Sequence, residues 1–207
     1  ATALEARPSD YSMPLLIPWA ELEMGNLRAA HAWSCDAGDF QTALRLLSAL
    51  QQLWITRGRF REGVAGFAAV FTDSRYHDRD IEPAVWVRAV ADSALLSVWI
   101  SVPASLHRAE EALAAARQLK DKRLVAECLT ACGMLAFNQA ERTEPYFAEA
   151  VDLARDSDDV ALLYRIYGYQ AFVGTATGNP VAAQAAGEQG HRLADELGDT
   201  VLRPQLD

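Results

Sequence analysis

The sequence lacks the short motifs and long apolar runs that identify many enzymes and membrane proteins. Its 207 residues contain no G-x-x-x-x-G-K-[ST] phosphate-binding loop and no G-x-S-x-G nucleophile motif, so it predicts neither kind of chemistry. It also contains no run of 18 apolar residues and no signal-peptide pattern, so it gives no support for membrane insertion or export. Paired carboxylates such as Glu110-Glu111 are explained by solvated helix faces. We therefore expect this segment not to be an enzyme and to need no cofactor.

Basic residues and cysteines are also scarce. The 19 Lys and Arg residues are scattered among 28 Asp and Glu residues, and the formal net charge is −9. Because nucleic acids and anionic membranes attract basic patches, we expect this segment to contact neither directly. The three cysteines, Cys35, Cys128 and Cys132, are an odd number without a disulfide-framework spacing. They indicate reduced thiols and a cytoplasmic location.

The abundant residues favour an all-α fold. Apolar residues make up 51% of the chain, and only 8 residues are proline. Ala and Leu dominate and β-branched runs are few, a composition that suits helices throughout. The length allows one large domain or two small ones.

Helical periodicity predicts three helices in the leading segment, over residues 19–37, 40–57 and 60–72. Asp39 is placed to cap the second helix, and Gly63 and Gly66 give the third a face that allows close packing. Tryptophans recur at helical spacing with Leu and Val, so we expect them to pack in a core. They are Trp33, Trp54 and Trp86.

A repeat of helical hairpins follows. The block that begins at Ala94 recurs 39 residues later at Gly133 and 38 residues after that at Ala171, with small residues at the same places. The turns "ARQLKD", "ARDSDD" and "ADELGD" each end in an Asp that is placed to cap the next helix. These caps are Asp121, Asp159 and Asp199. A two-helix unit of about 38–40 residues is typical of an α-solenoid, in which stacked hairpins cover each other's apolar faces.

These patterns divide the chain into four parts. They are an N-terminal flank, a helical segment that precedes the repeats, a polar loop, and three helix pairs followed by the start of a further helix. Their boundaries are residues 1–18, 19–72, 73–82 and 83–207.

The hairpins resemble tetratricopeptide repeats in a longer form of about 40 residues. Residues 21–67 are similar to the segment that leads into the helical repeats of bacterial, actinobacterial-type STAND ATPase regulators. The matching positions are Asn26 to Ala30, Trp33, Gly38-Asp39, Ala43 to Leu46, Trp54, Gly58 and Glu62-Gly63. Many such regulators end in a LuxR-type helix-turn-helix, and some begin with an adenylate cyclase domain.

The resemblance implies a sensor or interaction region of a larger transcriptional regulator. Such a region binds a partner protein or a small effector in the concave groove of the repeat stack, and self-association stays open. A free-standing peptide-binding scaffold of tetratricopeptide type is the alternative. An enzyme built on a helical scaffold is a third reading, although the sequence offers no convergent polar site for it.

The resemblance also implies which side chains face the groove. With Ala94, Gly133 and Ala171 taken as equivalent, fixed offsets place a charged row beside an apolar row. The groove residues predicted in this way are Arg88, Trp99, Glu127, Thr130, Met134, Phe137, Asn138 and Arg165. The alternative for the charged row is a set of ion pairs between adjacent helices at the surface, worth ~0–1 kcal/mol per pair.

Two residue pairs have the spacing of metal ligands on a helix. Cys128 and Cys132 are four residues apart, as are His31 and Cys35. No third ligand lies near either pair in sequence, so apolar packing of the thiols is favoured over a metal site.

Overall fold

The structure, a computed structural model, describes residues 13–196, and every element in this part of the chain is helical. These residues form two compact units, unit 1 up to Leu119 and unit 2 from Lys120. No helix among the described residues is long and apolar enough to cross a membrane. The predicted all-α fold is confirmed.

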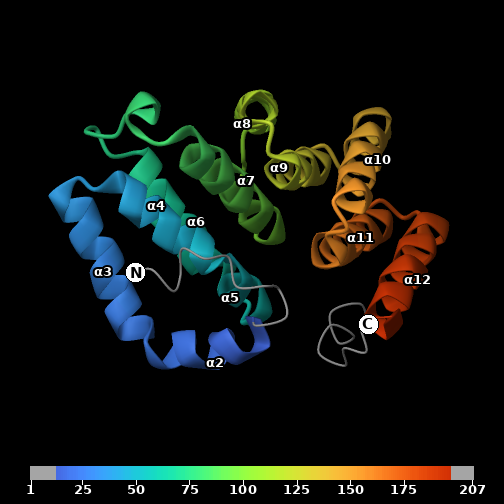
Figure 1. Ribbon diagram of the computed structural model, residues 1–207, viewed down its shortest axis with the longest axis horizontal. Coiled ribbons are helices and arrows are strands. Elements are labelled where there is room, and N and C mark those ends of the chain that lie inside the picture. Colours follow the sequence, from blue (N-terminus) through green and yellow to red (C-terminus); the bar gives the residue numbers. More distant parts are fainter. Residues whose placement is uncertain (1–12, 197–207) are drawn as a thin grey trace. The chain divides into compact units, whose positions relative to one another are not determined.

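Unit 1 contains seven α-helices and one short 3-10 helix among its described residues. They are α2 (Met13–Leu22), α3 (Met24–Ala37), α4 (Phe40–Ala49), α5 (Gln51–Thr56), α6 (Phe60–Phe71), η2 (Asp78–Asp80), α7 (Pro83–Trp99) and α8 (Leu106–Leu119). Helices α7 and α8 pack on each other as a hairpin, and α4 packs on α3, α6 and α7 (Figure 1).

The first two predicted helices are each divided into two. Glu23 separates α2 from α3, and Leu50 separates α4 from α5. The division is a bend, not a loop, because backbone hydrogen bonds continue through both residues. The amide of Glu23 donates to the Trp19 carbonyl (3.1 Å), and the amide of Trp54 donates to the Leu50 carbonyl (3.0 Å). The prediction of two unbroken helices was therefore wrong. The helix axis changes direction at each division, although nearly all of these residues are helical.

The predicted helix ends have the expected chemistry. The Asp39 side chain accepts a hydrogen bond from the Thr42 amide (3.1 Å) and caps α4. Gly38 and Gly58 have φ angles of +74° and +63°, a conformation that glycine adopts without a Cβ penalty. Sequence chemistry thus places both turns.

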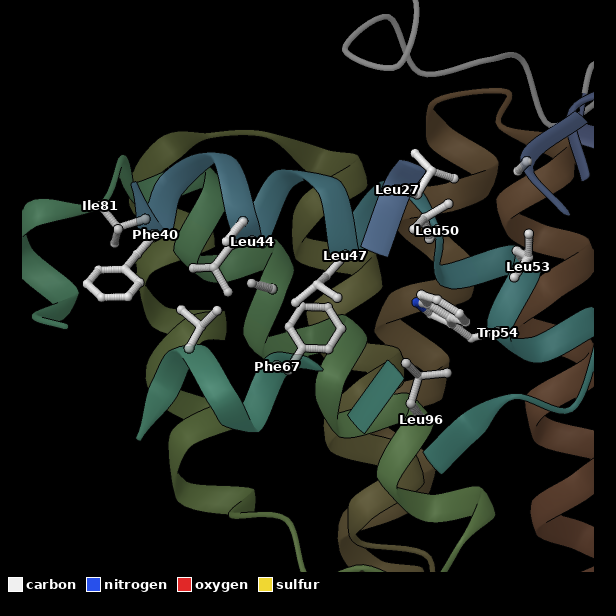
Figure 2. Close-up of a cluster of buried hydrophobic side chains, with 14 of the residues drawn as sticks. Leu27, Phe40, Leu44, Leu47, Leu50, Leu53, Trp54, Phe67, Ile81 and Leu96 are labelled. Atoms are coloured by element: carbon white, nitrogen blue, oxygen red, sulfur yellow. The ribbon is translucent and has the colours of Figure 1, made fainter. Parts of the chain in front are cut away.

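A single apolar cluster holds unit 1 together. The labelled side chains of Figure 2 gather in this cluster from α3, α4, α5, α6 and α7, together with Leu50 and Ile81, which lie between helices. Phe67 and Leu44 are fully buried at its centre, and Trp54 is 2% exposed. Burial of apolar area contributes roughly 25 cal/mol per Å², so this cluster is the main stabilising feature of the unit.

Glycines on α6 allow the close packing that the sequence predicts. A Cβ atom at Gly63 would lie 2.7 Å from the Leu96 side chain of α7, and one at Gly66 would lie 2.6 Å from Leu47 of α4. A side chain at either position would require the Leu96 or Leu47 side chain to move.

The segment between α6 and α7 is polar in sequence but is tied to the unit. Tyr76 and Ile81 are buried in its core. The Arg75 guanidinium donates to the carbonyls of Cys35 (2.8 Å) and Asp36 (3.2 Å) at the end of α3. A cation at a helix C-terminus satisfies carbonyls that have no partner within the helix.

Unit 2 contains two helical hairpins among its described residues. They are formed by α9 (Lys122–Leu135) with α10 (Ala140–Asp156) and by α11 (Val160–Ala176) with α12 (Pro180–Glu196) (Figure 1). Two of the three predicted caps are observed. Asp121 accepts from the Leu124 amide (3.0 Å), and Asp159 accepts from the Leu162 amide (3.0 Å).

The predicted helix pairs are present as α7 with α8, α9 with α10, and α11 with α12. Small residues lie where the helices of a pair meet, as the repeat predicts. A Cβ at Gly133 would lie 2.9 Å from the Phe147 ring, and one at Gly174 would lie 2.6 Å from the Ala183 backbone nitrogen. Asp199 and the start of a further helix fall outside the described residues, as do residues 1–12 of the predicted flank.

Candidate functional site

A groove in unit 2 is the more enclosed of two hollows in the part of the chain that the structure describes. Its volume is about 490 Å³, within the range of small-ligand and peptide sites. Residues of α10, α11 and α12 line it, together with the turns beside them. They are Phe137, Ala140, Thr143, Glu144, Phe147, Tyr167, Gln170, Val173, Gly174, Thr177, Asn179, Ala182, Ala185, Ala186 and Gln189.

The shape of the groove follows from residue size. Gly174 lets α11 approach the backbone of Ala183 in α12. Three alanines, spaced three and four residues apart on α12, then leave room above α11, because none of them fills the space with a long side chain. They are Ala182, Ala185 and Ala186. The floor is apolar, since Phe147, Tyr167 and Val173 are all buried.

Most polar groups of the groove are already engaged. Thr143 donates its hydroxyl to the Ala136 carbonyl (2.6 Å), and Thr177 donates to the Val173 carbonyl (2.8 Å). Asn179 caps α12 by accepting from the Ala182 amide (3.1 Å). The Tyr167 hydroxyl accepts a hydrogen bond from the Arg155 guanidinium (2.7 Å). These groups fix the walls and are poor candidates for binding a ligand.

Of the predicted groove residues, only Phe137 lines this site. Phe137 is half-buried in the turn between α9 and α10, and Asn138 beside it is exposed. Thr130 and Met134 are 2% and 0% exposed. The Thr130 hydroxyl donates to the Ala126 carbonyl of its own helix (2.7 Å). The assignment of these two side chains to an open groove was therefore wrong, because a buried side chain presents no surface to a ligand.

Two predicted groove residues belong to unit 1. Arg88 lies on α7 and forms an ion pair with Asp92 one turn along the same helix (3.4 Å). Trp99, at the end of α7, is half-buried and stacks on the Phe60 ring with centroids 5.5 Å apart. The predicted row thus divides between the two units.

The charged pair that remains, Glu127 and Arg165, joins α9 to α11 inside unit 2. An Arg165 nitrogen lies 4.0 Å from a Glu127 carboxylate oxygen, and Arg123 donates to the same oxygen (3.2 Å). Arg123 also pairs with Asp159, the residue that caps α11. The alternative of ion pairs between helices describes this contact better than a ligand site does. The pairs are not surface pairs, however, because Glu127 is 4% exposed.

The tryptophans differ in their environments. Trp54 is buried in the unit 1 cluster and Trp86 packs against it, as predicted. Trp33 is 68% exposed, so its assignment to the core was wrong. The buried face of α3 carries Met24, Leu27 and Ser34, and Trp33 is turned about 100° from Ser34 around the helix.

The two candidate metal-ligand pairs lie in different surroundings. Cys128 and Cys132 are buried and are not joined in a disulfide. The sulfur of Cys35 lies 3.7 Å from the His31 Nε2 atom. Burial lowers the pKa of His31 and, with the nearby Asp36 and Asp73, raises the pKa of the Cys35 thiol. Among residues 13–196, no group of three or more His, Cys, Asp or Glu side chains is arranged to hold a metal ion.

A second hollow lies on unit 1, with a volume of about 530 Å³. Arg108 spans it, with its guanidinium 4.6 Å from the Phe71 ring centre and donating to Asp78 (2.9 Å). Burial, the largest cause, raises the pKa of the neighbouring Tyr76. Because Arg108 is already paired with a carboxylate and a ring, the unit 2 groove is the better candidate.

None of the predicted groove residues belongs to the α11 and α12 walls of the groove. The predicted binding face lay on the first helix of each hairpin, whereas the groove is lined by one first helix, α11, and by the second helices α10 and α12. The available signal was the stretch "VAAQAAG", which begins at Val181 and repeats small residues at helical spacing.

Comparison with known proteins gives a consistent picture. No family model matches the sequence. Three mycobacterial proteins are 43% identical over 207 residues that cover 96% of this chain. One is from Mycobacterium bovis and two are from strains of Mycobacterium tuberculosis, and each carries the name "Putative HTH-type transcriptional regulator". The chain spans 23% of the length of these relatives.

Among solved structures, the crystal structure of BtubC (BKLC) from P. vanneervenii aligns with a TM-score of 0.52. The alignment covers 87% of this chain and 72% of that chain, at 19% identity. The similarity supports the helical fold alone. In sequence, the chain is similar to one segment of larger proteins that are named as HTH-type transcriptional regulators.

Proposed function

We propose that this chain is a non-catalytic regulatory segment of a larger, signal-responsive transcriptional regulator in the cytoplasm. The observation that carries the proposal is the 43% identity over 96% of the chain to regulators of which it spans 23%. Similarity over so much of this chain indicates a shared module, and the remaining length of such proteins leaves room for a DNA-binding domain.

The physical properties of the chain support an interaction role. A net charge of −9 disfavours direct contact with DNA. The unit 2 groove offers an apolar floor with a polar rim, which is typical of sites that bind a partner segment or a small effector. In the proposed role, the groove receives the signal and other parts of the protein bind DNA. A tetratricopeptide-like organisation and the STAND and LuxR features of the resembling family belong to the same proposal.

The free-standing scaffold is the weaker alternative. It predicts relatives of about the length of this chain, whereas the chain spans 23% of each of the three mycobacterial proteins.

The test is made in the full-length protein within the cell that produces it. Ala185 is exposed and lines the groove, so Ala185→Trp should fill the groove without disturbing the core. Val181 lies on the same helix, is 77% exposed and does not line the groove, so Val181→Trp is the matched control. We expect Ala185→Trp to change the transcript profile in the same direction as deletion of residues 122–196, and Val181→Trp to match the wild type. A transcript profile that is insensitive to the deletion contradicts the proposed function.

A further inference from the structure

Two glutamine side chains of the groove have no hydrogen-bond partner among the described residues. Gln170 lies on α11 and Gln189 on α12, and both are half-buried in the groove lining. The hydroxyls of Thr143 and Thr177 and the carboxamide oxygen of Asn179, by contrast, are bonded within the protein. The two free carboxamides are therefore the polar groups that the groove can offer to a ligand from its α11 and α12 walls.

A pair of carboxamides selects for the main chain of an extended peptide. Each carboxamide has both donor and acceptor atoms, the same pair that a peptide unit presents. A bound helix satisfies its main-chain groups internally, so its apolar face would bury both carboxamides without partners, at a cost of roughly 1–3 kcal/mol each. An extended segment leaves its N–H and C=O groups free to bond them.

The floor of the groove favours an apolar side chain. Phe147, Tyr167 and Val173 are buried beneath it, and Ala182 and Ala186 leave space between the helices. A volume of about 490 Å³ is large enough for a few peptide residues.

Charge favours a basic ligand. Glu144, on α10, is the charged side chain of the lining, and it is exposed without a hydrogen-bond partner among the described residues. The whole chain carries a net charge of −9, so a cationic segment is attracted over a longer range and an acidic one is repelled.

We infer that the groove binds an extended segment of a partner protein, with an apolar side chain on the floor, Lys or Arg beside Glu144, and main-chain groups paired with Gln170 and Gln189. This inference rests on the proposed function and names the chemistry of the partner. The site lies between α10, α11 and α12, so it includes one first helix of a hairpin, α11, and two second helices.

The experiment uses the 207-residue chain labelled with ¹⁵N and three short probe peptides. The basic probe is acetyl-Ala-Lys-Leu-Lys-Ala-amide, the acidic probe is acetyl-Ala-Glu-Leu-Glu-Ala-amide, and the third is the basic probe with its Leu nitrogen methylated. We expect the basic probe to shift the side-chain NH₂ signals of Gln170 and Gln189 and the amide signal of Gly174, with the Gly63 amide unmoved. It should bind at least tenfold more tightly than the acidic probe and at least fivefold more tightly than the methylated one.

Charge reversal supplies a matched pair of variants. Glu144→Lys should invert the preference between the basic and acidic probes, whereas Asp152→Lys, an exposed position of the same helix outside the groove, should preserve it. Helical circular dichroism checks that both variants fold.

Several outcomes overturn the inference. The absence of shifts with every probe, equal binding of the basic and acidic probes, or full binding of the methylated probe would each do so. Shifts of the same groove signals on removal of residues 197–207, or on dilution without peptide, would assign the groove to this chain's own tail or to a second copy.

If the probes fail while Ala185→Trp still alters transcription, the proposed function stands with a different ligand. If the probes bind while deletion of the segment leaves transcription unchanged, the proposed function fails and this inference stands.

Discussion

At the scale of single residues, Gly174 shows how one missing side chain brings two helices together. A Cβ atom there would lie 2.6 Å from the backbone nitrogen of Ala183 and 2.9 Å from its Cα. A flexible side chain could move away from such a contact, but backbone atoms of α12 cannot move without the helix. The glycine is therefore required by the packing of α11 on α12.

We expect Gly174→Ala to lower the free energy of unfolding by about 1–3 kcal/mol, because the added methyl group forces the two helices apart. Gly187, on α12, is the control, since a Cβ there would meet no atom within 4 Å. Gly187→Ala should instead stabilise the chain by roughly 0.5–1 kcal/mol, because alanine loses less entropy in a helix. Urea unfolding followed by circular dichroism measures both, and equal effects would contradict the close contact at Gly174.

Asp73 is a second residue whose local contacts make a measurable prediction. Hydrogen bonds from the Arg75 side chain, and then from its amide, lower the pKa of Asp73 from 3.8 to about 2. Because the folded pKa lies below the unfolded value, the stabilising contribution is present above pH 3.8 and is lost as the pH falls from 3.8 to about 2. Its partner Arg75 is exposed, so solvent screening keeps the contribution small.

The titration itself is the sharper measurement. We expect the Asp73 carboxyl carbon to titrate by NMR with a midpoint near 2, and Arg75→Gln to move that midpoint up toward 3.8. Arg61→Gln, at an exposed position of α6, should leave it in place. A midpoint that does not respond to Arg75→Gln would mean that the contact is absent in solution.

At the scale of helices, aspartate caps set where α4, α9 and α11 begin. Asp39, Asp121 and Asp159 each accept an amide hydrogen bond from the residue three positions later. Asp159 differs from the other two because its second oxygen also accepts from Arg123 of α9. That residue therefore caps its own helix and ties it to the preceding hairpin.

We expect Asp121→Ala to cost about 1 kcal/mol, the usual value of a lost cap, and Asp159→Ala to cost roughly 2 kcal/mol. The excess should disappear when both are measured in an Arg123→Gln background, since the ion pair is then already absent. Chemical denaturation of the three single and two double variants, beside the wild type, gives the coupling energy. Equal costs for the two caps in the wild-type background would show that the pair with Arg123 adds nothing.

At the scale of the whole chain, the two units can be monitored separately. All five tryptophans lie in unit 1, at positions 19, 33, 54, 86 and 99, and none lies in unit 2. Tryptophan fluorescence therefore reports unit 1, whereas the loss of helical circular dichroism reports both units.

Ending the chain at Gly178 should unfold or destabilise unit 2. The truncation removes α12 and exposes the faces of α11 that it covers, because a hairpin cannot bury its apolar surface alone. We expect a lower thermal midpoint by circular dichroism or aggregation, with a smaller change in the transition seen by tryptophan fluorescence. A thermal unfolding curve that matches the intact chain would mean that α12 does not stabilise α11.

Much of the fold could be predicted because it depends on local chemistry. Helix periodicity, aspartate caps and glycines with positive φ act within a few residues, so the caps at Asp121 and Asp159 and the helix ends beside Gly38 and Gly58 were predicted correctly. The bends at Glu23 and Leu50 were not predicted. The backbone hydrogen bonds through both residues are nearly helical, and neither position holds a Gly, a Pro or a capping side chain that would mark the bend in the sequence.

The sequence by itself determined that this chain is an all-α repeat of hairpins with small residues at the crossings, since each helix must bury its own apolar stripe. Only the tertiary structure decided which neighbouring helix covers each stripe and which side chains that contact buries. In the tertiary structure Thr130 and Met134 are buried and Trp33 is exposed. The candidate groove is lined by α10, α11 and α12. The tertiary structure also placed Glu127 beside Arg165 inside unit 2, where a repeat register alone indicates only a charged row. Long-range packing fixes these choices because the depth of a side chain depends on the neighbouring helices, which local sequence does not specify.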